Sequence, residues 1–141
     1  NYVSGRDRGP TVIEELLSSI KWNSDGLVTV VVQDEKEGKV LMVAWANEEA
    51  IAKSLLEGRA CFWSRSRKAL WLKGESSGHY QVIKDIYLDC DGDSLVFKVE
   101  QVGGIACHTG RNSCFYKKLN KSQWVTSEPV IKKQEDIYGK S

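Results

Sequence analysis

Two alternating segments joined by a short turn constrain the fold more than any other feature of this sequence. Residues 79–90 (HYQVIKDIYLDC) and 94–101 (SLVFKVEQ) alternate apolar and polar side chains at a period of two. This pattern is typical of β-strands with one buried face. Asp91-Gly92, between the two segments, is a frequent turn sequence. The pair therefore predicts an antiparallel hairpin, and part of the core must be built on a β-sheet.

Five further segments are predicted to be strands, because they are short, apolar and bounded by turn residues. They are residues 26–33, 39–46, 60–65, 70–73 and 114–118. The charged stretch 34–38 is predicted to connect the first two as a hairpin. Most neighbouring strands are thus joined by short turns, which favours antiparallel pairing.

Two short helices are predicted among these strands. The first runs from Thr11 to about Lys21: Thr11 and Glu14 form a capping box, and the apolar residues that follow share one helical face. The second begins after Asn47, a good N-cap, and is closed by Gly58. The expected fold class is α+β, mainly antiparallel β-sheet with two short helices.

Length and composition predict one globular domain. Of 141 residues, 41% are apolar and 28% charged, which excludes a disordered chain. We place the domain at residues 11–127, between a polar arm (1–10) and a polar tail (128–141). A net charge of +1 disfavours a general nucleic-acid or membrane-surface binder. Without an export signal or a long apolar run, we expect a cytoplasmic protein whose four cysteines are reduced or bind metal.

The densest chemical signal is the pentapeptide Asp89-Cys90-Asp91-Gly92-Asp93. In an extended segment its three aspartates would share one face, while Cys90 would point away. Carboxylates suit Mg²⁺ or Ca²⁺ and a thiolate suits Zn²⁺, so the segment could serve two metals. An acidic hairpin turn without metal explains such a motif equally well. An EF-hand is rejected, because Ser94 stands where that loop requires glycine.

A second cluster, Cys107-His108-Thr109-Gly110-Arg111-Asn112-Ser113-Cys114, contains two cysteines that a glycine-containing loop can bring onto one metal. With Cys90 they make three thiolates, and three protein ligands with one open position are typical of catalytic zinc. His108 could complete the site or act as a base. Cys61, within the apolar run ACFW, is interpreted as a small buried side chain.

The third stretch, residues 63–79 (WSRSRKALWLKGESSGH), combines basic, hydroxyl and tryptophan side chains. Arginine, lysine and closely spaced hydroxyls can bind phosphate. Interleaved tryptophans can stack on bases, which also fits single-stranded nucleic acid. A solvated basic hairpin whose tryptophans fill the core is the simpler explanation for this stretch taken alone.

Taken in this order, WSRSRxxLWxKGESSGH, DCDGD and CHTGxxSC resemble the phosphoribosyl-AMP cyclohydrolase family of histidine biosynthesis. The likeness covers roughly residues 27–116. The chain looks like the stand-alone form common in archaea, and the terminal residues 135–139 look like an archaeal tail. The resemblance implies hydrolytic opening of the adenine ring of phosphoribosyl-AMP, the third step of histidine biosynthesis.

The resemblance also implies an intertwined homodimer with active sites at the subunit interface. In the family, the cysteine matching Cys90 joins the pair matching Cys107 and Cys114 from the other subunit to hold one Zn²⁺ per subunit. The aspartates matching Asp89, Asp91 and Asp93 bind Mg²⁺. His108 is then expected to move protons as general base and acid. The expected substrate contacts are Arg65, Arg67, Lys73, Ser76, Ser77 and His79.

A rival hypothesis is a zinc-stabilised module that binds nucleic acid through the Trp/Arg-rich stretch. The near-neutral charge counts against it, and so do the aspartates 89, 91 and 93, whose carboxylates would repel a phosphate backbone. We therefore expect a small nucleotide substrate and a second copy of the chain as partners, and neither nucleic acid nor membrane.

Overall fold

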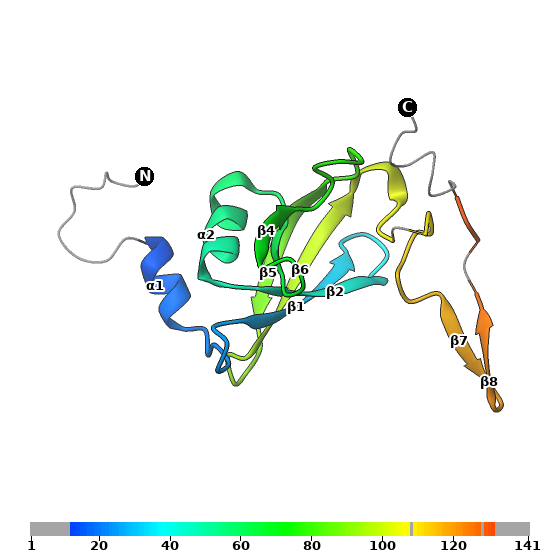
Figure 1. Ribbon diagram of the computed structural model, residues 1–141, viewed down its shortest axis with the longest axis horizontal. Helices are drawn as coiled ribbons and strands as arrows, with labels where there is room; N and C mark the ends of the chain where they lie inside the picture. Colours follow the sequence, from blue (N-terminus) through cyan, green and yellow to red (C-terminus); the bar gives the residue numbers. More distant parts are fainter. Residues whose placement is uncertain (1–11, 108, 128, 132–141) are drawn as a thin grey trace.

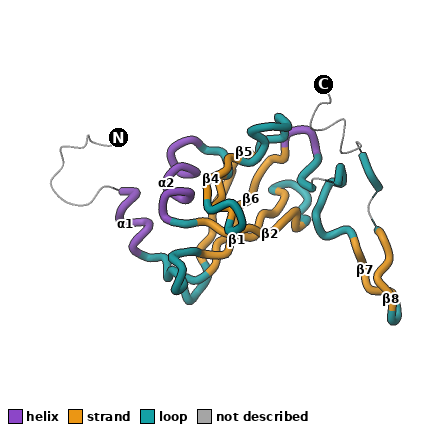
Figure 2. Tube along the Cα trace, viewed as in Figure 1, coloured by secondary structure: helices purple, strands orange, loops and turns teal. Residues whose placement is uncertain are grey.

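The computed structural model describes residues 12–107, 109–127 and 129–131. It confirms the α+β class, with mainly antiparallel sheets and two α-helices (Figures 1 and 2). The elements in chain order are α1 (Val12–Ser18), β1 (Val28–Asp34), β2 (Val40–Ala46), α2 (Glu48–Glu57), β3 (Cys61–Ser64), β4 (Ala69–Leu72), β5 (Gln81–Leu88), β6 (Ser94–Gln101), the 3₁₀ turn η1 (Val102–Gly104), β7 (Lys117–Asn120) and β8 (Gln123–Thr126).

The main sheet has four strands in the order β2-β1-β6-β5. The hairpins β1–β2 and β5–β6 are antiparallel, as predicted. They join side by side through a parallel pairing of β1 with β6, in which Val30 lies opposite Leu95. Hairpin signals identify only strands that are neighbours along the chain, so they do not predict this parallel pairing. β2 and β5 consequently form the two edges of the sheet.

One face of this sheet carries the hydrophobic core. Alternate residues of β1 and β6 are buried, as period-two patterning requires. Phe97 of β6 stacks on Phe62 of β3 with ring centroids 6.2 Å apart, and Phe62 contacts Trp71 of β4 at 5.2 Å. The β3–β4 hairpin and α2 thus cover the same face.

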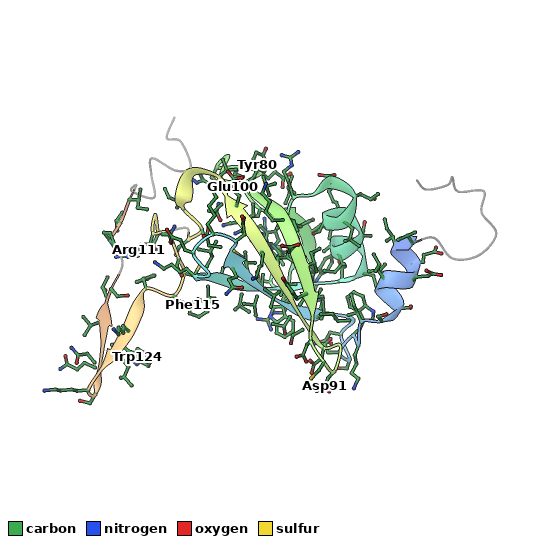
Figure 3. The ribbon with its side chains drawn as sticks, turned by 180° about the vertical axis from the view of Figure 1, so that it is seen from behind. Tyr80, Asp91, Glu100, Arg111, Phe115 and Trp124 are labelled. Carbon is green, nitrogen blue, oxygen red and sulfur yellow. The ribbon has the colours of Figure 1, made fainter. Side chains whose placement is uncertain are left out.

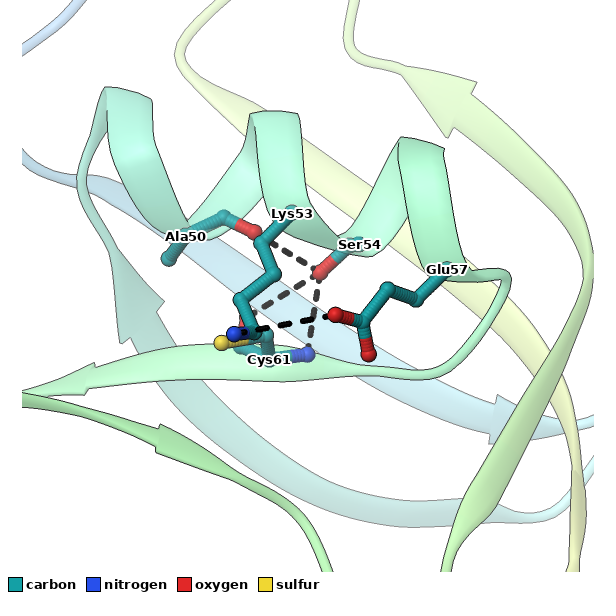
Figure 4. Close-up of polar contacts among 5 residues, drawn as sticks. All are labelled: Ala50, Lys53, Ser54, Glu57 and Cys61. Carbon is teal, nitrogen blue, oxygen red and sulfur yellow. Dashed lines mark hydrogen bonds and ion pairs between the residues drawn. The ribbon is translucent and has the colours of Figure 1, made fainter.

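Helix α2 has the predicted ends. The Asn47 side chain accepts a hydrogen bond from Ala50 N–H at 2.9 Å, and Gly58 adopts a left-handed φ of 72° while donating to Ser54 O. The buried Ser54 hydroxyl also accepts from Cys61 N–H at 2.9 Å, which fastens the helix to β3 (Figure 4). Cys61 is buried, as predicted, and burial raises the pKa of its thiol.

Two sequence predictions need correction, and one strand was missed. The first helix ends at Ser18 rather than near Lys21, and none of its residues is fully buried, although Leu17 packs partly buried against the core. Cys114 lies in a loop, and the strand predicted at 114–118 begins at Lys117 instead. β8 was not predicted. Thr11 and the polar segments 1–10 and 132–141 lie outside the described residues.

The β7–β8 hairpin forms a separate two-stranded sheet that projects from the body (Figure 1). It lies at the opposite end of the molecule from α1. Every residue of its two strands is exposed. Among the described residues, none of the helices has both the length and the apolar character needed to cross a membrane.

Candidate metal centre and polar pocket

The loop after η1 folds back on itself and brings two cysteines together. Cys107 N–H donates to Arg111 O at 3.1 Å, and Gly110 N–H donates back to Cys107 O at 2.9 Å. The loop then reaches β2, where Cys114 N–H donates to Leu41 O at 2.7 Å. The backbone therefore fixes both ends of the seven-position spacing between Cys107 and Cys114.

The two thiols interact directly. Cys107 is buried, and its Sγ lies 3.0 Å from Thr109 Oγ1. The Cys114 residue as a whole is exposed, but burial of its thiol, followed by the charge and hydrogen bonding of Cys107, raises the pKa of Cys114 to about 12. A thiol with this pKa stays protonated at neutral pH unless a metal ion displaces the proton. Paired soft sulfur ligands of this kind suit Zn²⁺.

Lys73 places a cationic group beside this thiol pair. It follows β4, and its Nζ donates to Ala106 O at 2.7 Å, one residue before Cys107. Burial lowers the pKa of Lys73, while the neighbouring Cys114 and Cys107 thiols act in the opposite direction. The positive charge of Lys73 in turn lowers the pKa of Cys114, which opposes the effect of burial. Lys73 is therefore placed to stabilise negative charge on these sulfurs.

The Asp89–Asp93 segment forms a tight turn between β5 and β6 rather than an extended strand. Gly92 N–H donates to Asp89 O at 2.9 Å, and Gly92 has a φ of 77°. The expectation that Cys90 points away from the aspartates is wrong, because the turn brings the Cys90 sulfur and carboxylate oxygens of Asp89 and Asp91 within 4.8 Å of one another. The three residues are exposed and could hold a cation together.

Asp93 joins the same turn through a hydrogen bond with Asp89. This hydrogen bond is the main cause that lowers the pKa of Asp89 and raises that of Asp93. The two carboxyl groups therefore titrate as an interacting pair rather than independently. Carboxylate oxygens are the ligands that Mg²⁺ prefers, and a bound cation would favour the ionised form of both.

The Asp89–Asp93 turn and the Cys107–Cys114 thiol pair lie near opposite edges of the main sheet. Cys114 is tied to Leu41 on β2, one edge strand, whereas Cys90 follows Leu88 at the end of β5, the other edge strand. Three strand spacings of about 4.8 Å separate these edges, or about 14 Å. In Figure 3, Asp91 and the loop marked by Arg111 and Phe115 lie in different parts of the molecule. Because zinc–sulfur bonds measure about 2.3 Å, one chain does not bring its Cys90 to its own thiol pair.

A polar pocket of about 330 Å³ opens beside Lys73. Four predicted substrate contacts line it, namely Arg67, Lys73, Ser76 and Ser77. Its wall depends on Gly74, which has a φ of 89° and where a Cβ atom would lie 2.4 Å from Tyr80 N. Hydroxyl groups and cations around one cavity can hold a phosphate or a ribose.

Two other predicted contacts lie outside this pocket. The Arg65 guanidinium stacks over the Trp45 ring at 4.8 Å from its centroid. The His79 ring packs against η1, where a Cβ atom on Gly103 would come within 2.5 Å of it. His108, the predicted acid–base group, lies outside the described residues.

Comparison with known proteins decides the family. The sequence model of phosphoribosyl-AMP cyclohydrolase matches residues 42–116. A phosphoribosyl-AMP cyclohydrolase of Nitrosospira multiformis is 59% identical over 123 residues, which cover 87% of this chain and 95% of the relative. Those of Nitrosomonas eutropha and Marinobacter nauticus are 55% and 57% identical, covering 89% and 87% of this chain and 97% and 89% of the relatives. This chain belongs to the phosphoribosyl-AMP cyclohydrolase family.

Membership in the phosphoribosyl-AMP cyclohydrolase family confirms the prediction of a hydrolase of histidine biosynthesis. The archaeal affinity suggested by the sequence is not borne out, since these relatives are bacterial. The geometry also shows contacts that sequence reasoning missed. Lys73 was expected to face substrate, and its placement beside the cysteines depends on a loop 33 residues further along the chain.

Sequence reasoning also missed the contacts of Gln101, which hold the segment that leads into the loop of Cys107 and Cys114. The Gln101 side chain accepts from Gln81 Nε2 at 2.8 Å and donates to His79 O at 2.9 Å. It thus fixes the start of η1, which leads into the thiol loop. Glutamine in an alternating strand carries no signal that distinguishes this buried pair from an exposed position.

Proposed function

We propose that this protein hydrolyses phosphoribosyl-AMP, opening the adenine ring between its first nitrogen and sixth carbon, with zinc and magnesium as metal cofactors. Family membership gives the reaction class, and one structural observation carries the zinc site: the paired thiols of Cys107 and Cys114 beside Lys73. The thiols fit zinc because two sulfur ligands already lie together with a neighbouring cation to balance their charge.

Cys90 of the partner subunit supplies the third ligand in this proposal. The separation of Cys90 from the thiol pair across the sheet supports a shared site, because a third sulfur from the same chain lies too far away. The expectation of an intertwined homodimer follows from the same requirement. Zinc with three protein ligands and one open position supplies Lewis acidity and water activation at neutral pH.

The remaining residues bind and orient the nucleotide. Arg67, Ser76 and Ser77 hold phosphate and ribose oxygens in the polar pocket, and the guanidinium can bind phosphate with two parallel hydrogen bonds. Arg65 and His79 contribute nearby polar contacts. His108 takes a proton from the attacking water and returns one to the leaving ring nitrogen. The aspartates 89, 91 and 93 bind Mg²⁺, which neutralises negative charge close to the substrate.

The test is an ultraviolet assay of ring opening on phosphoribosyl-AMP, before and after removal of metal with a chelator. We expect turnover to be lost on chelation and restored by zinc. Cys107→Ser should lose both zinc and turnover, because hydroxyl replaces thiolate as ligand. Cys61→Ala is the matched control, since Cys61 is a buried thiol on β3 away from the site. A folded, zinc-loaded dimer without turnover would overturn the proposal.

A further inference from the structure

The β7–β8 hairpin has two large apolar side chains on one face that no other described residue of the chain covers. Leu119 and Trp124 lie directly opposite each other in its register, so their side chains share one face. Both are exposed, Trp124 over 69% of its surface. An isolated two-stranded hairpin is marginally stable in water. This hairpin therefore needs a surface on which to pack.

A complementary surface lies at the other end of the molecule. An apolar groove of about 380 Å³ runs between α1, α2 and β5, and we call it the α1–β5 groove. It is lined by Leu16, Leu17, Ser19, Ile20, Ile51, Leu55, Ile86, Leu88 and Leu95. Its rim is also exposed: Leu16 on α1 is open over 51% of its surface, and Leu88 over 43%. The groove can accept large apolar side chains.

The hairpin cannot reach this groove within one molecule. Figures 1 and 2 show α1 at one end of the long axis and the hairpin at the other. Only another molecule can bring the two surfaces together. Charge favours a second copy of the same chain, because the hairpin carries Lys117, Lys118 and Lys121 and no acidic residue over 117–127. The groove borders the acidic Asp89–Asp93 turn, where Lys21 N–H donates to Gly92 O.

Chain connectivity restricts where the hairpin of a second copy can lie. β7 begins three residues after Cys114, and three extended residues span about 10 Å. If Cys114 shares a metal with Cys90 of the partner subunit, the hairpin must start within about that distance of the Asp89–Asp93 turn. Leu88 of the groove is two residues before Cys90. The groove is thus the apolar surface next to the shared metal site.

We infer that the β7–β8 hairpin of one subunit docks in the α1–β5 groove of a second copy, with Leu119 and Trp124 facing the groove and Lys117, which lies on the same face, directed toward the acidic turn. The inference rests on the shared metal site of the proposed function. A two-fold symmetric dimer makes this contact twice, because each chain carries both surfaces. The hairpin then acts as an arm that carries Cys114 to the partner's turn.

The direct test is photo-crosslinking of the full chain with p-benzoylphenylalanine in place of Trp124. Unlabelled and ¹⁵N-labelled copies are mixed as dimers that exchange subunits, and the cross-linked peptides are identified by mass spectrometry. We expect mixed-isotope cross-links to the peptides that contain Leu16 or Leu88. Cross-links confined to one copy, or to another surface of the second copy, overturn the inference.

A second measurement compares dimer dissociation by sedimentation. Trp124→Ser should raise the dissociation constant by roughly 30-fold or more, as expected for a buried aromatic anchor. Leu16→Lys should weaken the dimer as well. The matched control is Leu56→Ser, which removes an exposed apolar side chain from α2 away from the groove. An unchanged dissociation constant for Trp124→Ser, or a wild-type protein that is monomeric, also overturns the inference.

Turnover of the wild-type protein separates this inference from the proposed function. Active, metal-dependent protein whose hairpin cross-links elsewhere refutes the docking and leaves the activity standing. Predicted cross-links in a zinc-loaded protein that does not open the adenine ring refute the activity and leave the docking standing.

Discussion

Replacing Lys73 with methionine tests whether this side chain serves the thiol pair or the substrate. Methionine keeps the apolar part of the side chain and removes the ammonium group that donates to Ala106 O at 2.7 Å. A hydrogen bond from a charged donor contributes about 1.5–3 kcal/mol. The contact matters more when zinc holds Cys107 and Cys114 ionised, because the ammonium then faces two negative sulfurs.

We therefore expect Lys73→Met to raise the zinc dissociation constant roughly ten- to a hundredfold, since about 1.4 kcal/mol corresponds to a factor of ten. The assay is competition with a chromogenic chelator at constant pH and salt. Lys73→Arg retains the positive charge and should recover much of the affinity. The control is Lys53→Met, which removes the lysine that pairs with Glu57 on α2 and should bind zinc as the wild type does.

The kinetic constants distinguish the two roles of Lys73. If its main partner is the phosphate of the substrate, KM rises in Lys73→Met while zinc binds as before. Zinc affinity within about twofold of the wild type in a folded Lys73→Met protein would refute the reasoning from the Ala106 contact. Circular dichroism on the same samples verifies the fold.

Three further predictions follow from individual contacts. Zinc affinity should rise with pH by at least about tenfold per unit between pH 6.5 and 8.5, because the pKa of Cys114 is raised to about 12 and zinc binding releases its proton. Calorimetry in two buffers of different ionisation enthalpy counts the released protons, and a count of zero would contradict the raised pKa. Ser54→Ala should lower the free energy of unfolding by about 1–3 kcal/mol in a denaturant titration, because the buried Cys61 N–H loses its acceptor (Figure 4). Gly74→Ala should raise KM while leaving zinc bound, because a Cβ atom there meets Tyr80 N at 2.4 Å and displaces the pocket wall; an unchanged KM would show that the pocket is not used.

Sequence reasoning succeeded where structure is determined locally. Helix α2 begins and ends where Asn47 and Gly58 predict, because capping involves only residues within one turn. The β5–β6 hairpin also forms as its alternation and its turn residues indicate. Cys107 and Cys114 come together as expected, since a glycine-containing loop between them needs only local hydrogen bonds to close.

The sequence failed where placement depends on distant segments or on turn geometry. The parallel pairing of β1 with β6 joins residues about 65 positions apart, as with Val30 and Leu95, and alternation carries no information on such a partner. At Asp89–Asp93 the sequence predicts the turn itself, but the predicted side-chain directions hold only for an extended backbone. The left-handed Gly92 reverses the chain there, so the sulfur of Cys90 lies on the side of the carboxylates.

The apolar stripe of α1 is neither a clear success nor a clear failure of prediction. Its helical spacing is plain in the sequence, but its side chains are incompletely buried in the structure. Val12, Leu16 and Leu17 repeat at helical spacing, yet only Leu17 packs against the core, while Val12 and Leu16 stay exposed. Apolar stripes of this kind normally pack against another surface, but here part of the stripe is exposed at the α1–β5 groove. The docked hairpin of a second copy would cover this stripe and would also give the isolated β7–β8 sheet a packing partner. The same contact thus accounts for two surfaces that a single chain leaves unpacked, while carrying Cys114 toward the partner's Cys90.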